Sequence, residues 1–149
     1  MEFLNNMIKL NKLITEIVYS FRETNSDISE EDNSVIEVEY EFSTPQNKYI
    51  VIFNSFRREI GHFDLLFKTK LNEVEIDPEY LNKTGEGKVY SIIETVSKII
   101  EDFIYQYEGE KGGIKKIYIE GTDPKRKSVY KKLFPKYLPK EILDIVEIY

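Results

Sequence analysis

The stretch Asn82-Lys83-Thr84-Gly85-Glu86-Gly87-Lys88, together with the segment that follows it, decides the fold that we predict for this chain. From Val89 to Tyr107, apolar residues recur at steps of three and four, which is the spacing of one buried helical face. They are Val89, Ile92, Ile93, Val96, Ile99, Ile100, Phe103, Ile104 and Tyr107. A glycine-bearing loop that leads into a helix start can bring backbone N–H groups to a phosphate. The sequence therefore predicts a long core helix with an anion-binding loop in front of it.

Length and composition indicate one domain, 1–149, of an ordinary globular protein. The chain is 41% hydrophobic and 32% charged, and no apolar run approaches the ~20 residues of a membrane span. It has no Cys and one His, His62, which disfavours disulfides and an all-protein transition-metal site. The start Met1-Glu2-Phe3 does not resemble a signal peptide. We therefore expect a cytoplasmic protein with no membrane segment and no metal.

The net charge of −6 is unevenly distributed along the chain. Between Lys111 and Lys140, ten basic residues face only two acidic ones, Glu120 and Asp123, so the rest of the chain is strongly acidic. Such asymmetry indicates an anionic partner for the basic end, although a solvated helix face beside an acidic body gives the same pattern. Nucleic acid is the less favoured partner, because the body is acidic and no motif that reads bases is recognised.

Before the glycine-bearing loop, the sequence predicts one helix and three strands. Amphipathic spacing predicts a helix over Phe3–Phe21, and the polar segment Glu23–Ser34 is predicted to be a loop. Three strands follow, at Ile36–Phe42, Tyr49–Phe53 and Ile60–Thr69, where apolar residues alternate with polar ones or form a short run. Short turns join them, which predicts an antiparallel meander.

After the central helix, the sequence predicts a strand, a helix and a last strand. The strand is Ile114–Glu120, and Asp123-Pro124 is a typical helix start, with a capping side chain followed by proline at the first helical position. Pro135 and Pro139 are predicted to end that helix, and Ile142–Tyr149 reads as a strand. The predicted fold is α/β (α+β), in the order helix-strand-strand-strand-helix-strand-helix-strand. The central helix is predicted to pack on the strands Tyr49–Phe53 and Ile114–Ile119.

This order and the glycine motif resemble the GNAT acyltransferase superfamily, and the resemblance implies a GNAT-like mixed sheet. In that superfamily, a loop with the pattern Gln or Arg, two residues, Gly, one residue, Gly or Ala binds the pyrophosphate of acetyl-coenzyme A through backbone amides. Gly85 and Gly87 match both glycines of the pattern, and Asn82 departs from its first position. The resemblance implies acetyl-coenzyme A as the bound cofactor, held by Thr84, Gly85, Gly87 and Lys88.

A second motif, Ser128-Val129-Tyr130-Lys131-Lys132-Leu133-Phe134, is similar to a GNAT segment whose tyrosine often protonates the departing thiolate of coenzyme A. The resemblance therefore implies Tyr130 as a general acid. Asp123-Pro124 stands in the region where the superfamily often has an Asn. For the base, the sequence offers Asp64, which shares a strand face with His62, or a Glu of Ile36–Phe42. A solvent-facing His–Asp pair without a catalytic role is the alternative interpretation.

The chain is also similar to small uncharacterised proteins of bacteriophages and Bacteroidetes, which have a Thr-Gly-x-Gly loop and an Arg-x-x-x-Tyr helix. Thr84–Gly87 and the pair Arg126 and Tyr130 carry this likeness, and Arg126 can bind an anion or stack on Tyr130. The likeness implies a phage-type accessory protein, located in the host cytoplasm or the virion. Two function classes stay open. One is an N-acyltransferase, intact or degenerate; the other is a non-catalytic protein that contacts a partner or its own copies, such as a virion component or an inhibitor of host defence.

Overall fold

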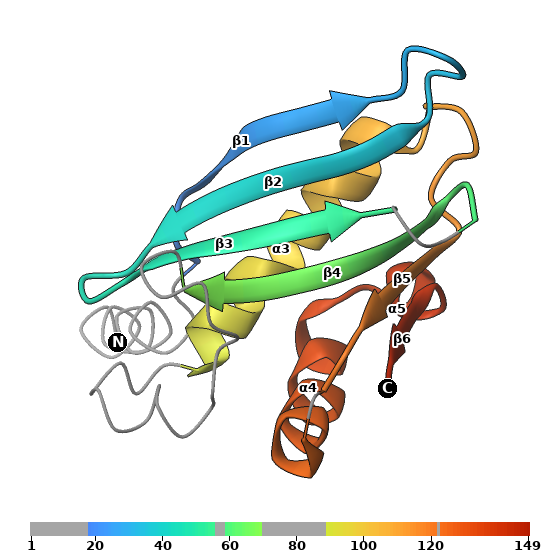
Figure 1. Cartoon of the computed structure of the whole chain (residues 1–149). Helices are drawn as coiled ribbons and strands as arrows, with labels where there is room; N and C mark the ends of the chain where they lie inside the picture. Colours follow the sequence, from blue (N-terminus) through green and yellow to red (C-terminus); the bar gives the residue numbers. More distant parts are fainter. Residues whose placement is uncertain (1–17, 56–58, 70–88, 122) are drawn as a thin grey trace, which may run out of the picture.

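The computed structural model describes residues 18–55, 59–69, 89–121 and 123–149. In chain order, the elements are β1 (Phe21–Ile28), β2 (Val35–Ser43), β3 (Lys48–Asn54), β4 (His62–Thr69), α3 (Val89–Tyr107), β5 (Lys116–Ile119), α4 (Pro124–Tyr137), α5 (Lys140–Leu143) and β6 (Val146–Ile148). Figure 1 shows β1 at one side of the sheet and the short strands β5 and β6 at the other.

The described strands form one six-stranded mixed sheet in the order β1-β2-β3-β4-β5-β6. Strands β1 to β4 pair antiparallel, which confirms the predicted meander. Strand β5 pairs parallel to β4, and β6 pairs parallel to β5. A parallel pair needs a crossover connection, and the chain between β4 and β5 contains α3. The predicted α+β class with a mixed sheet is therefore confirmed at that level.

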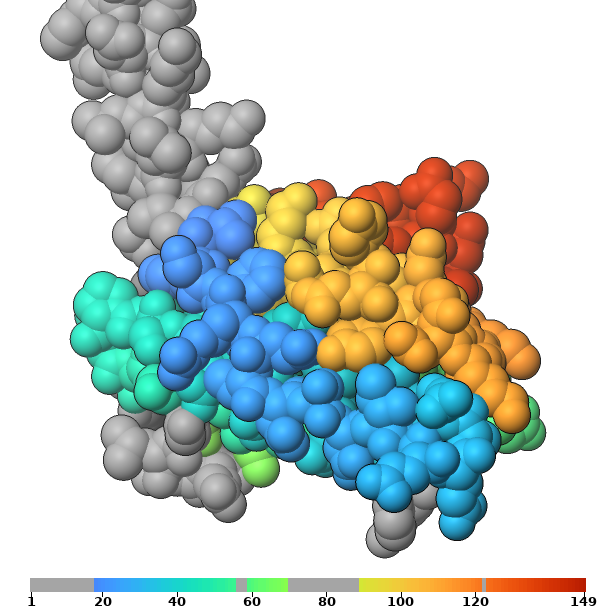
Figure 2. Space-filling model, turned by 90° about the horizontal axis from the view of Figure 1, so that it is seen from above, coloured from blue at the N-terminus to red at the C-terminus, as the bar shows by residue number. Residues whose placement is uncertain are grey.

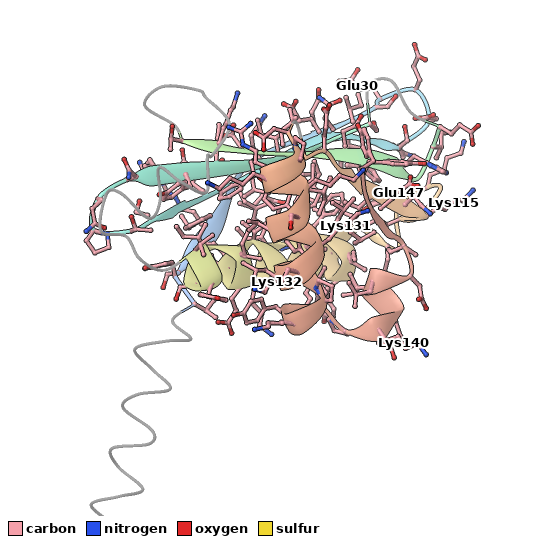
Figure 3. All side chains as sticks on the ribbon, turned by 90° about the horizontal axis from the view of Figure 1, so that it is seen from below. Glu30, Lys115, Lys131, Lys132, Lys140 and Glu147 are labelled. Atoms are coloured by element: carbon pink, nitrogen blue, oxygen red, sulfur yellow. The ribbon has the colours of Figure 1, made fainter. Side chains whose placement is uncertain are left out.

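Helix α3 forms over the predicted residues and supplies one wall of the core. Most of its apolar face is buried, and the aromatic ring of Phe103 stacks on Phe53 with centroids 3.9 Å apart and meets Phe63 edge-on at 5.0 Å. Figure 3 shows α3 and α4 on the same side of the sheet. The other side is covered by no described helix, and we call it the uncovered face.

The start of α4 is as predicted, but its end is not. Asp123 caps the helix, because its Oδ1 accepts a hydrogen bond from the backbone N–H of Arg126 at 2.8 Å, and Pro124 is the first helical residue. Pro135 lies inside the helix, which continues to Tyr137, so the prediction that Pro135 ends it is wrong. A proline in the last turn removes only one helical hydrogen bond, and Leu138 N–H still bonds Phe134 O at 3.0 Å.

The largest error in the predicted order is at the beginning of the sheet. The segment predicted as the loop Glu23–Ser34 contains most of β1, so four strands precede α3 instead of three. Phe21 begins β1, so the predicted helix Phe3–Phe21 cannot extend to Phe21; residues 3–17 of that helix lie outside the described residues. β1 is exposed along nearly all its length and is held by pairing with β2, with register shifts after Glu23 and after Asp27.

The predicted last strand is also shorter than expected. Ile142 and Leu143 belong to α5, and only Val146–Ile148 pairs as a strand, parallel to β5. The backbone of Tyr149 then accepts a hydrogen bond from Gly121 N–H at 2.8 Å. This bond ties the end of the described chain to the loop between β5 and α4.

Candidate functional site

The neighbouring parallel strands β4 and β5 have unequal lengths. Among the described residues, β5 pairs with β4 only over His62–Leu65, opposite Lys116–Ile119. Strand β4 continues to Thr69, paired on its other side with β3. Residues Leu66–Thr69 of β4 therefore have no β5 residue beside them, and a gap opens between the two strands at their carboxyl ends.

A cavity of about 210 Å³ occupies this gap. Its lining comes from both strands and from α4, and consists of Leu65, Leu66, Phe67, Lys68, Ile119, Glu120, Tyr130 and Phe134. Its volume is below the roughly 300 Å³ lower bound of pockets for drug-sized ligands, so it suits a slender ligand chain or a single side chain.

The cavity reaches both sides of the sheet. Successive strand residues point to opposite faces, and the cavity is lined by buried Leu65 and Phe67 as well as by Leu66, which is 49% exposed. We call the side of Leu66, Lys68 and Glu120 the outer mouth, because these residues point to the uncovered face. The inner side is formed by the buried strand residues and α4.

Tyr130, the residue implied as a general acid, lines the inner side of the cavity. It is 4% exposed, and its ring meets Phe134 edge-on at 5.7 Å. Its position depends on how α4 starts, because Gly121 lies against the first turn of the helix. A Cβ at Gly121 would be 2.5 Å from Lys127 Cα and 2.6 Å from Lys127 N. Glycine at this position therefore allows α4 to approach the end of β5.

His62 and Asp64 lie on the uncovered face, as predicted, but they do not line the cavity. His62 Nδ1 is 3.0 Å from the hydroxyl of Tyr118, and the two rings stack with centroids 5.9 Å apart. Asp64 is the register partner of Tyr118. Glu120 is the carboxylate that lines the cavity. Sequence reasoning did not single it out, because its place follows from where β5 ends.

The predicted cofactor loop, Thr84, Gly85, Gly87 and Lys88, lies outside the described residues. The first turn of α3, which directly follows it, is described. Ser91 in this turn is fully buried, and its Oγ has no hydrogen-bond partner among the described residues.

The side of this turn that faces α4 carries an aromatic ring and a cation. Tyr90 is 42% exposed, and Lys136 Nζ of α4 lies 5.4 Å from its ring centroid. The start of α3 therefore combines the positive end of a helix dipole with a lysine and an aromatic ring.

Arg126 has a structural contact. Its Nη1 lies 3.3 Å from Oδ2 of Asp123, the capping residue, and the Arg126 side chain is 15% exposed. Arg126 does not appear among the residues that line the cavity. It therefore supports the helix start in this structure, and anion binding by Arg126 stays a prediction.

A second hollow lies at the far end of β1 and β2, lined by Ser20, Phe21, Arg22, Glu41, Phe42, Ser43 and Lys48. Its central charge is Glu41, which is 5% exposed and has Arg22 Nη2 at 3.5 Å and Lys48 Nζ at 3.9 Å. The two cations compensate the buried carboxylate. This arrangement accounts for Glu41 without a ligand, so we do not place the functional site here.

Two tyrosines connect α3 to the first strands through carboxylates. The hydroxyl of Tyr40, which is fully buried, donates to Asp102 Oδ2 at 2.9 Å, and the hydroxyl of Tyr107 donates to Glu23. Burial is the main cause that raises the pKa of both hydroxyls, and the adjacent carboxylates add to it. The pKa of Tyr107 rises to about 12. Both hydroxyls stay neutral, so their hydrogen bonds to Asp102 and Glu23 connect α3 to β2 and β1.

Three further observations bear on the site. The described residues contain no group of three or more His, Asp or Glu side chains that could hold a metal ion. None of the described helices is long and apolar enough to cross a membrane. Comparisons with protein-family models, with curated proteins and with solved structures gave no match. The geometry of the site and the sequence resemblance are therefore the two indications of function.

Proposed function

We propose that this chain is a GNAT-like acyltransferase that transfers an acyl group from coenzyme A to an amine. The observation that supports this most is the cavity between the diverging strands β4 and β5, with Tyr130 in its wall. The cavity volume of about 210 Å³ suits a slender ligand chain such as the pantetheine arm of an acyl donor. The sequence resemblance independently implies a chemical role for Tyr130.

The donor's phosphates are expected at the start of α3. The glycines Gly85 and Gly87 directly precede this helix in the sequence, and a helix start attracts anions through its dipole and its unbonded N–H groups. Ser91 offers a buried hydroxyl in the first turn, and Lys136 offers a positive charge near the ring of Tyr90 in the same turn. We propose that the loop and these side chains bind the pyrophosphate together.

The two proton transfers are assigned to opposite sides of the cavity. Tyr130 on the inner side gives its hydroxyl proton to the sulfur that leaves as the carbon–sulfur bond breaks. The new carbon–nitrogen bond requires the attacking amine to lose a proton, and we assign that proton to Glu120 at the outer mouth. Glu120 is favoured over Asp64 and over the Glu residues of β2, because it is the carboxylate in the cavity wall.

Isothermal titration calorimetry with acetyl-coenzyme A tests the donor site. The natural protein is expected to bind, and Leu66→Trp is expected to bind severalfold more weakly, because the larger ring fills the cavity from a position that is 49% exposed. Ile28→Trp is the matched control: Ile28 is an exposed apolar strand residue of β1, 37% exposed, and it does not line the cavity. No heat of binding with the natural protein at millimolar ligand would rule out the acyl-donor proposal.

A non-catalytic role is the second candidate, and the uncovered face of the sheet favours it. Such a protein would work by contact, as a virion component or an inhibitor of host defence, with a protein partner or copies of itself. Native mass spectrometry distinguishes the two candidates. A stable complex or oligomer without coenzyme A bound supports the contact role. The phage-type origin stays a proposal based on the sequence likeness alone.

A further inference from the structure

The uncovered face carries a row of polar side chains that runs across all six strands. Register partners place in one line Asp27, Glu37, Asn54, Asp64, Tyr118 and Glu147. We call this set the cross-strand row. Four of its six members are acidic, and none is basic. With strands about 4.8 Å apart, the row is about 24 Å long, which is the length of an extended peptide of about seven residues.

The row passes beside the outer mouth of the cavity. Asp64 and Leu66 are two residues apart on the same face of β4, and Glu120, which directly follows β5, is two residues after Tyr118. Two strand residues span about 7 Å, which is close to the reach of an extended lysine side chain. A peptide lying along the row can therefore place a lysine amine at the mouth.

Several lysines of α4 and α5 lie on the opposite side of the molecule. Figure 3 shows Lys131, Lys132 and Lys140 on the side of the helices, away from the sheet. A positively charged partner is repelled by these lysines and attracted to the four acidic side chains of the cross-strand row. Lys68 and Lys116 lie on the same face as the row but are not members of it, so the row is the part of this face that attracts a cation. An anionic partner such as a nucleic acid is repelled from the same face.

We propose that the uncovered face binds an extended, lysine-rich peptide segment along the cross-strand row and presents one lysine to the outer mouth. This inference depends on the proposed function for the chemistry that follows, since it names the acceptor of the acyl group. The docking itself depends only on the shape and charge of the face.

Fluorescence anisotropy at low salt tests the docking, with a labelled peptide in which lysine alternates with serine and no acyl donor present. The natural protein is expected to bind this peptide, and to bind the same peptide with glutamate in place of lysine far more weakly. The double variant Glu37→Gln/Asp64→Asn is expected to bind about tenfold more weakly, because two charge pairs between these carboxylates and lysines of the peptide are lost. Glutamine at position 37 can still accept the hydrogen bond that Asn54 Nδ2 donates to Glu37 Oε1 at 2.9 Å.

The matched control is Glu108→Gln/Glu141→Gln, which makes the same change in net charge at exposed residues after α3 and in α5. Its affinity for the peptide is expected to be unchanged. Equal losses in both double variants would show that only net charge matters and would overturn the inference. So would salt-sensitive self-association in sedimentation velocity that is abolished by Glu37→Gln/Asp64→Asn, because a second copy would then occupy the face.

The two proposals fail in distinguishable ways. Peptide binding without acetyl-coenzyme A binding would support the docking face and rule out the acyltransferase proposal. Acetyl-coenzyme A binding without discrimination between the lysine and glutamate peptides would support the acyltransferase proposal and overturn the peptide-docking inference.

Discussion

Tyr130 is the residue on which the proposed chemistry depends most directly. Tyr130→Phe removes the hydroxyl and keeps the ring that packs on Phe134, so acetyl-coenzyme A should bind as before. Loss of a general acid typically slows a reaction by about 10²- to 10⁴-fold, and we expect thiol release to slow within this range. The control is Tyr137→Phe on the same helix, since Tyr137 is outside the cavity lining. Equal rates for both variants would exclude the acid role.

Tyr107 gives a second prediction at the residue scale, on the pH dependence of stability. Its pKa is raised to about 12 in the folded protein, whereas an ordinary tyrosine has a pKa of about 10. The unfolded chain therefore loses this proton first, and the free energy of unfolding falls between pH 10 and about 12, by about 1.4 kcal/mol per pH unit for one such group. Below pH 10, the contribution is fully present.

Urea unfolding over this pH range checks the sign and the residue. Tyr107→Phe should make the decline less steep, because one linked proton is removed. Tyr105→Phe should leave it unchanged, since Tyr105 is 84% exposed on the same helix. An unchanged slope in Tyr107→Phe would contradict the assignment.

At the scale of elements, the contact between the β5–α4 loop and the first turn of α4 sets the position of the cavity wall. A methyl group at Gly121 would lie within 2.7 Å of three Lys127 atoms, two of them backbone. Gly121→Ala is therefore expected to lower the free energy of unfolding by about 1–3 kcal/mol, as overpacking usually does. It is also expected to weaken binding of acetyl-coenzyme A, because α4 must move away from the strand.

Gly109→Ala is the control for this change. A methyl group at Gly109 has no atom within 4 Å, so its effect in urea unfolding should be small. If the two alanine variants unfold at the same urea concentration, the close approach at Gly121 does not limit where α4 lies.

The sequence predicted well those elements whose buried residues recur at regular spacing along the chain. Helix α3 and strands β2 to β4 have apolar side chains at regular spacing, because one face of each is buried in the core. Strand β1 has almost no buried side chain and is held by backbone pairing with β2, so its sequence Phe21–Ile28 has no such pattern. Backbone pairing is not visible in a single sequence.

The site was predictable only in part, for a related reason. The resemblance identified Tyr130, and the structure places it in the wall of a cavity. The cavity itself follows from β5 ending at Ile119 while β4 continues to Thr69, which is a relation between two elements far apart in the chain. Glu120 and the cross-strand row depend on register in the same way, so no local motif marks them.

At the scale of the whole molecule, an acidic row and a group of lysines lie on different faces. The sheet side carries the acidic row, and Lys131, Lys132 and Lys140 lie on the helix side, as Figure 3 shows. Figure 2, seen from above, shows β1 beside α3 along one edge of this layered arrangement. Partners are therefore expected to distinguish the two faces by charge, and raised salt should weaken binding at either.

The irregular pairing of β1 has a consequence for how copies of the chain meet. A regular outer strand offers its free amides and carbonyls as a template for another chain, which is how ordered aggregates grow. The two register shifts in β1 interrupt that template on one side of the sheet, and β6, at the other side, has only three residues. Neither margin invites fibre growth, so crowding in the cell should leave the broad surfaces, and not the strand margins, as the places where molecules touch.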